Sequence, residues 1–85
     1  MAMFNSSFSE LMEFRLGEVV SSNIKKLIKG SGLTTEYLSF RTNLSIPTIN
    51  RLKAGQHFSV HSLCALAEVL NVDPLSFFKE AEGET

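Results

Sequence analysis

Glycine and proline residues divide this chain into short segments, and within each segment the apolar residues recur at the spacing of a helix. In the segment Glu18 to Lys29, for example, Val20, Ile24 and Leu27 follow one another at intervals of three or four residues. No segment shows the sustained alternation of apolar and polar residues that marks a half-buried strand. The pattern therefore predicts an all-α fold. The expected helices span residues 18–29, 34–42, 45–54, 59–71 and 73–79.

Residues with the chemistry of helix caps begin four of these helices. Ser, Thr and Asp side chains accept hydrogen bonds from the free N–H groups of a first helical turn, and glycine or asparagine tolerates the left-handed conformation of a turn. We expect Asn43 to be left-handed between the second and third helices, and Gly55 to end the third helix. The predicted N-caps are Thr34, Ser45, Ser59 and Asp73.

The length of 85 residues and the hydrophobic content of 44% favour one small domain with one core. We place this domain at residues 18–80, after an N-terminal extension of residues 1–17 and before an acidic tail of residues 81–85 that is expected to fray. Cys64 is expected to pack beside the apolar stripe of its helix. The core side chains predicted for the last four helices are Leu38, Ile49, Leu52, Leu63, Leu66, Ala67, Leu70, Leu75 and Phe78.

The N-terminal extension carries apolar residues that also recur at helical spacing, so it can form an additional helix. These residues are Phe4, Phe8, Leu11 and Met12. The second predicted helix carries Tyr37 and Phe40 at positions expected to face solvent, and large apolar side chains there favour a cover. We expect the extension to pack over them, and a role as a subunit interface remains the alternative.

The charge distribution favours a polyanionic partner although the net charge is only −1. Between Arg15 and Lys53 there are seven Lys and Arg residues against two Glu residues, and the acidic residues gather on both sides of this stretch. A basic middle can form one attractive face on a nearly neutral protein. No apolar run approaches the ~20 residues that span a membrane, no signal peptide is present, and Cys64 stands alone, so we expect a cytoplasmic protein.

Two short helices, residues 34–42 and 45–54, are joined by about three residues, which is the geometry of a helix-turn-helix. In such a unit the second helix can enter the major groove of DNA while the first lies across the backbone. Ser39 is small enough to let the two helices approach each other. The sequence therefore predicts that the third helix carries the function.

At these residues the chain resembles the Cro and phage-repressor type of helix-turn-helix, also called the XRE family. The resemblance covers roughly Val20 to Phe78. The matching residues are Ile24, Leu27, Gly32, Leu33, Thr34, Glu36, Leu38, Leu44, Ser45, Ile49, Leu52, Gly55, Ser59, Leu63, Leu66, Ala67, Leu70, Val72 and Leu75.

The resemblance implies a compact five-helix, lambda-repressor-like domain that binds double-stranded DNA as a homodimer, commonly as a repressor. Arg51 is the strongest candidate for base recognition, because its guanidinium group can donate two hydrogen bonds to guanine. The implied base contacts are Ile46, Pro47, Thr48, Asn50 and Arg51. The implied phosphate contacts are Thr35, Ser45, Lys53 and Gln56.

A second function class remains open, because family members often carry glutamine at the positions of Thr35, Ile46 or Pro47. A protein-interaction module, such as an antitoxin-like or regulatory subunit, can keep the fold and lose such side chains. We expect no enzyme activity, since no catalytic constellation is present, and no cofactor or small-molecule ligand. We also expect no metal site: His57 and His61 are four residues apart, but the predicted N-cap Ser59 separates them.

Overall fold

The computed structural model describes residues 2–80, with side chains from Phe8 onward, and it confirms the all-α prediction. The described residues form four α-helices and one 3₁₀ helix, and none of them is in a strand. No described helix has the length and apolar character needed to cross a membrane. The elements are α1 (Ala2–Ser31), α2 (Thr35–Thr42), α3 (Ile46–Lys53), α4 (Val60–Leu70) and η1 (Pro74–Phe78).

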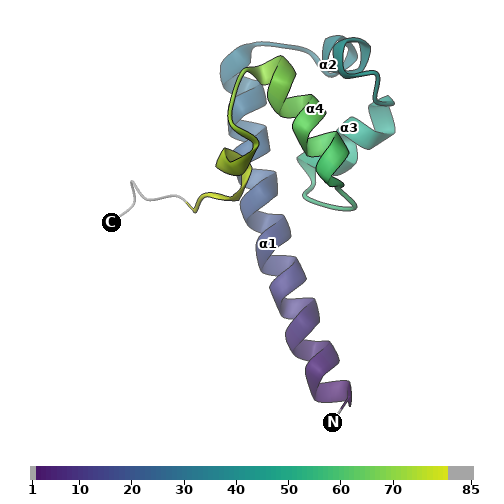
Figure 1. The fold of residues 1–85 in the computed structure, drawn as a ribbon, viewed down its shortest axis with the longest axis vertical. Coiled ribbons are helices and arrows are strands. Elements are labelled where there is room, and N and C mark those ends of the chain that lie inside the picture. Colours follow the sequence, from purple (N-terminus) through teal and green to yellow (C-terminus); the bar gives the residue numbers. More distant parts are fainter. Residues whose placement is uncertain (1, 81–85) are drawn as a thin grey trace.

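The first helix, α1, is a single helix of 30 residues that begins far outside the globular part of the molecule (Figure 1). The extension is therefore helical over its described residues 2–17, and it continues without a break into the helix predicted from Glu18. Because a continuous helix cannot fold back, the extension points away from α2, and the prediction that it covers Tyr37 and Phe40 is wrong. The Phe40 side chain is 79% exposed. The Phe4 side chain and the tail of residues 81–85 lie outside the described residues.

All four predicted N-caps are confirmed, and they set where the later helices begin. The side chain of Thr34 accepts a hydrogen bond from the N–H of Tyr37, and Ser45 does the same for Thr48. Ser59 and Ser62 form a reciprocal capping box, and Asp73 accepts from the N–H of Leu75. Each cap satisfies a donor that the first helical turn leaves free.

The core lies where α1, α2, α3, α4 and η1 meet, around the second half of α1 (Figure 1). Cys64 is exposed, so the prediction that it packs in this region is wrong. Leu70 is only partly buried against the core. The buried apolar side chains are Val20, Ile24, Ile28, Leu38, Ile49, Leu52, Leu63, Leu66, Ala67 and Phe77.

The last predicted helix is a 3₁₀ helix, and this changes which of its side chains are buried. Leu75 and Phe78 were expected in the core, but Phe77 is fully buried and Leu75 is 69% exposed. A 3₁₀ helix has three residues per turn, so its inward face follows a different phase from that of an α-helix. The side chain of Asn23 on α1 fixes η1 by donating to the carbonyl groups of Phe77 and Lys79, at 2.8 and 2.7 Å.

Candidate nucleic-acid interface

The turn between α2 and α3 has the conformation that the sequence predicts. Asn43 is left-handed, with φ of 63°, and its N–H donates to the carbonyl of Ser39. The hydroxyl of Ser39 in turn donates to the carbonyl of Leu44. These contacts, together with the buried Leu38, hold the two helices at a fixed angle. The position of α3 on the surface is therefore set by the turn and by the core.

The eight residues of α3 make slightly more than two turns, so the helix has one side that packs on the core and one side that faces solvent. Ile49 and Leu52 pack into the core. Three of the predicted base-contact residues, Pro47, Asn50 and Arg51, are exposed. Ile46 joins them at the first position of the helix, where 39% of its surface is exposed. The structure therefore brings these four residues together on one solvent-facing surface.

Thr48, the fifth predicted base contact, is less exposed than the other four. Its side chain is half-buried, its N–H donates to the hydroxyl oxygen of Ser45, and the two hydroxyl oxygens lie 2.8 Å apart. Thr48 therefore helps to form the N-terminal cap of α3. The helix dipole and the free N–H groups of the first turn favour an anion near Ser45, which is exposed.

Two predicted phosphate contacts, Thr35 and Lys53, lie next to each other although they are 18 residues apart in the sequence. The ammonium group of Lys53 donates to the hydroxyl of Thr35 at 3.3 Å, so it bridges the end of α3 and the start of α2. The carbonyl of Lys53 also accepts a hydrogen bond from the hydroxyl of Ser21 on α1, at 2.7 Å. The end of α3 is thus attached to two other helices.

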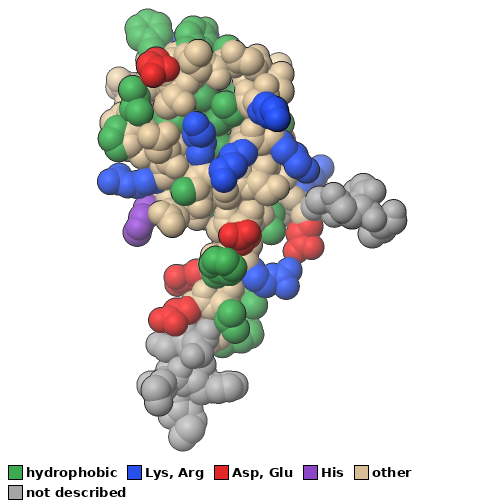
Figure 2. Space-filling view, turned by 180° about the vertical axis from the view of Figure 1, so that it is seen from behind, with side chains coloured by type: hydrophobic (Ala, Val, Ile, Leu, Met, Phe, Trp, Pro, Cys, Tyr) green, Lys and Arg blue, Asp and Glu red, His purple; other side chains and the backbone are tan. Residues whose placement is uncertain are grey.

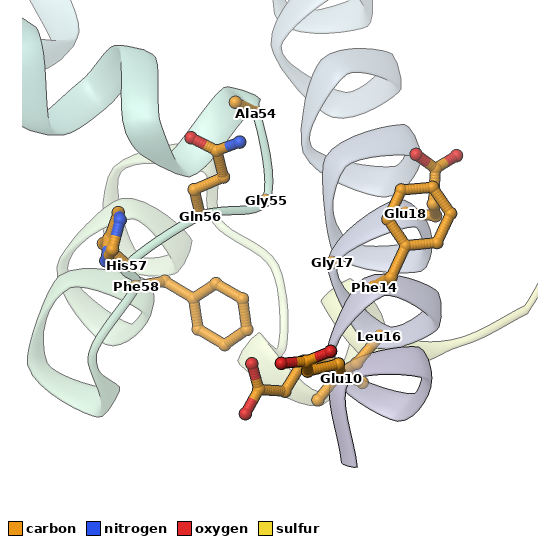
Figure 3. Close-up of a pocket in the computed structure, with 11 residues that line it drawn as sticks. Glu10, Phe14, Leu16, Gly17, Glu18, Ala54, Gly55, Gln56, His57 and Phe58 are labelled. Carbon is orange, nitrogen blue, oxygen red and sulfur yellow. The ribbon is translucent and has the colours of Figure 1, made fainter. Parts of the chain in front are cut away.

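The remaining predicted phosphate contact, Gln56, lies in the loop between α3 and α4, where its side chain is exposed. Its N–H donates to the carbonyl of Arg51 at 2.9 Å, so this loop continues the C-terminal end of α3. Figure 3 shows Gln56, His57 and Phe58 across a cleft from α1. The cleft has a volume of about 600 Å³ and opens to solvent.

The loop rests on α1 through a contact between two glycine residues that the sequence analysis did not identify. A Cβ atom added to Gly17 would lie 2.7 Å from the carbonyl oxygen of Gly55, and one added to Gly55 would lie 2.0 Å from that of Gly17. Gly55 also has a positive φ of 71°. Gly17 inside a helical pattern is the signal that could have revealed this contact, because glycine is unfavourable within a helix and is often kept there for a packing reason.

The charges differ between the two ends of the molecule. Figure 2 shows Lys and Arg side chains gathered over one face of the globular part, while Asp and Glu side chains lie along the lower part of α1. A single ion pair, Arg15 with Glu80 at 3.0 Å, was found among the described residues. A search of those same residues for clusters of three or more potential metal ligands found none.

Comparison with known proteins supplies one match. A family model described as helix-turn-helix matches residues 24–77, which is more than half of the chain and includes α2, α3, α4 and most of η1. No curated protein and no solved structure matches the sequence.

Proposed function

The chain belongs to the Cro and C1 type of helix-turn-helix proteins, a family of DNA-binding regulators, and we propose that it binds double-stranded DNA in a sequence-specific way. In this proposal α3 enters the major groove and contacts the bases. The observation that carries this proposal is the exposed surface of α3. It presents Arg51 and Asn50 beside Pro47, with Ile46 at the start of the helix. The major groove of DNA is wide enough to admit an α-helix.

Base recognition on this surface combines two kinds of contact. Arg51 donates two hydrogen bonds to the O6 and N7 atoms of a guanine, and Asn50 pairs with an adenine. Ile46 and Pro47 contact the methyl groups of thymines. Thr48 contributes its methyl group while its hydroxyl stays with Ser45.

Phosphate contacts flank this surface and fix the register of the domain on the duplex. Ser45 and the first turn of α3 bind one phosphate through N–H groups. Lys53 and Thr35 form one polar pair at the junction of α3 and α2, and Gln56 extends from the following loop. These contacts supply affinity without sequence preference.

We also propose where the protein acts, in which oligomeric state, and with what effect on transcription. The protein acts in the cytoplasm as a homodimer on two half-sites, and as a repressor, since bound DNA is then closed to other proteins. It is a binding protein without enzyme activity, cofactor or small-molecule ligand.

Selection of bound sites from a random duplex library tests this function. We expect an enriched motif in which each half-site contains a guanine that loses its enrichment when the library is selected with Arg51→Ala. No enrichment, together with no binding to any duplex at low salt, would reject DNA recognition.

One observation favours a second candidate, a protein-interaction module. Phe40 on α2 is 79% exposed and Tyr37 beside it is 40% exposed, stacked under Arg41, whose guanidinium carbon lies 5.7 Å from the ring centroid. A folded protein that does not bind DNA at low salt, and that loses its capacity to bind a protein partner on Phe40→Glu, would favour this candidate.

A further inference from the structure

The half of α1 that precedes the globular part is largely exposed among the described residues. We define the arm as residues 8–16, which lead up to the contact between Gly17 and Gly55 (Figure 1). An isolated helix of this length is marginally stable in water and normally depends on packing of its apolar side chains. Five large apolar side chains of the arm are exposed: Phe8 (60%), Leu11 (60%), Met12 (43%), Phe14 (65%) and Leu16 (45%).

We propose that the arm pairs in antiparallel orientation with the arm of a second copy of this chain, and that this pair is the dimer interface. The position of the pair then sets the distance between the two α3 helices; this last step rests on the proposed binding to DNA.

The charge of the arm excludes the polyanions as its partner. Glu10 and Glu13 are its acidic residues, and its one cation, Arg15, is paired with Glu80. DNA phosphates and anionic lipid surfaces both attract helices with basic polar faces. An apolar and mildly acidic helix instead suits another protein helix.

The area of the apolar surface matches what one side of a stable dimer needs. Four of the five side chains, Phe8, Leu11, Met12 and Leu16, lie within about 140° of one another around the helix, whereas Phe14 lies in the cleft with Glu10. At roughly 150–250 Å² for each fully buried side chain, these four, which are about half exposed, offer roughly 300–500 Å². One side of a standard interface buries about 800 Å², of which about 56–65% is apolar. A second copy supplies the same area from the same residues, as a two-fold interface requires.

The two carboxylates of the arm and Met12 lie on different sides of the helix, although Phe14 and Leu16 line the same cleft as the carboxylates. Glu10 and Glu13 line the cleft below the loop between α3 and α4 (Figure 3 labels Glu10), whereas Met12 and Leu16 line a second hollow that extends to Phe78. Two arms can therefore meet at Met12 while their carboxylates stay apart.

The length of the arm fits an antiparallel pair on DNA. An α-helix rises about 1.5 Å per residue, so the 12 residues from Met12 to the buried Ile24 span about 18 Å. Two arms that cross at Met12 place the two Ile24 residues about 36 Å apart along the helix axis. Ile24 packs in the same core as Ile49 and Leu52 of α3, so the separation of the two α3 helices is of the same order as the distance of about 34–36 Å between half-sites one DNA turn apart.

The oligomeric state of the full chain without DNA tests the interface independently of DNA binding. By sedimentation equilibrium we expect twice the chain mass of 9.4 kDa for the native protein and the single mass for the double variant Leu11→Glu, Met12→Glu. Circular dichroism checks that this variant is folded, because neither side chain is part of the core. Phe40→Glu is the matched control, since it removes an equally large exposed side chain from α2, and we expect it to stay dimeric.

Three outcomes of this experiment would overturn the proposal. They are a monomeric native protein, a dimer that survives the double variant, and a dimer that dissociates on Phe40→Glu. DNA binding is measured separately: a dimer that binds no DNA would reject the proposed function and leave the arm interface standing.

Disulfide trapping tests the orientation of the arms. In a background with Cys64→Ser, which removes the exposed native thiol, we expect Met12→Cys to form a disulfide-linked dimer on mild oxidation and Phe8→Cys to form no disulfide between the two chains. Phe8 lies four residues from the crossing, so two copies of it are about 12 Å apart along an antiparallel pair. Efficient trapping at both positions would show a parallel pair and overturn the proposed spacing.

Discussion

At the scale of single residues, Arg51 and Lys53 are neighbouring cations at the end of α3, but their side chains have different surroundings. Arg51 is exposed on the outer surface of α3, and among the described residues its side chain is in no hydrogen bond or ion pair. Lys53 is half-buried and is held by the hydroxyl of Thr35. A free guanidinium group suits recognition of a base edge, and a cation fixed near two helix ends suits a phosphate.

We therefore expect Arg51→Ala and Lys53→Ala to weaken DNA binding in different ways. Arg51→Ala should remove about 1–3 kcal/mol of preference for the selected site over a scrambled duplex, because the lost contact reads a base. Lys53→Ala should weaken both duplexes alike and lower the salt slope by about one unit. Fluorescence anisotropy titrations with both duplexes measure this. Equal losses on both duplexes for Arg51→Ala would remove it from base recognition.

At the scale of the elements, the contact between Gly17 and Gly55 joins α1 to the loop that follows α3. Gly17 lies inside α1, where glycine is unfavourable for a helix, and the backbone of Gly55 approaches it too closely for any side chain. Gly30, near the end of the same helix, has no neighbouring atom within 4 Å of an added Cβ. Two glycines of one helix thus have different roles.

The variants Gly17→Ala and Gly30→Ala should change stability in opposite directions. Gly30→Ala should stabilise the protein by about 0.5–1 kcal/mol through helix propensity. Gly17→Ala gains the same propensity but pushes the loop off α1, and we expect a net loss of about 1–3 kcal/mol. Urea denaturation followed by circular dichroism compares the two. A Gly17→Ala protein as stable as Gly30→Ala would mean that the contact is not maintained in solution.

At the scale of the whole molecule, a nearly neutral protein separates its charges. Figure 2 shows Lys and Arg side chains gathered over one face of the globular part, whereas the arm carries Glu10 and Glu13 and a single cation, Arg15. Attraction of DNA then depends on one face, and the arm stays free for contact with protein. Net charge alone would have excluded a nucleic-acid partner.

This separation predicts a strong dependence of DNA binding on salt. If a dimer contacts about 6–10 phosphates, the association constant should fall about 10³–10⁵-fold between 50 and 200 mM salt. The measurement is a series of titrations with a random duplex at increasing salt concentration. A flat profile would argue against phosphate contacts of this number.

The amino-acid sequence by itself determined the local structure of this protein. Short-range chemistry decides whether Ser45 caps a helix or Asn43 turns left-handed, because both depend on groups a few residues away. The apolar periodicity likewise predicted the buried Leu38, Ile49 and Leu52. The exposure of the predicted base-contact residues Pro47, Asn50 and Arg51 follows from the same periodicity, since residues outside the apolar stripe face solvent.

The tertiary structure decided the features that depend on distant residues. The pairing of Thr35 with Lys53 and the approach of Gly17 to Gly55 need the packed arrangement of three helices, and no local signal contains it. The 3₁₀ geometry that buries Phe77 follows from how η1 fits against Asn23. The direction of the arm is also a tertiary property: apolar spacing predicts a helix, but only the unbroken backbone through Gly17 shows that this helix leaves the domain and exposes Phe8 and Leu11.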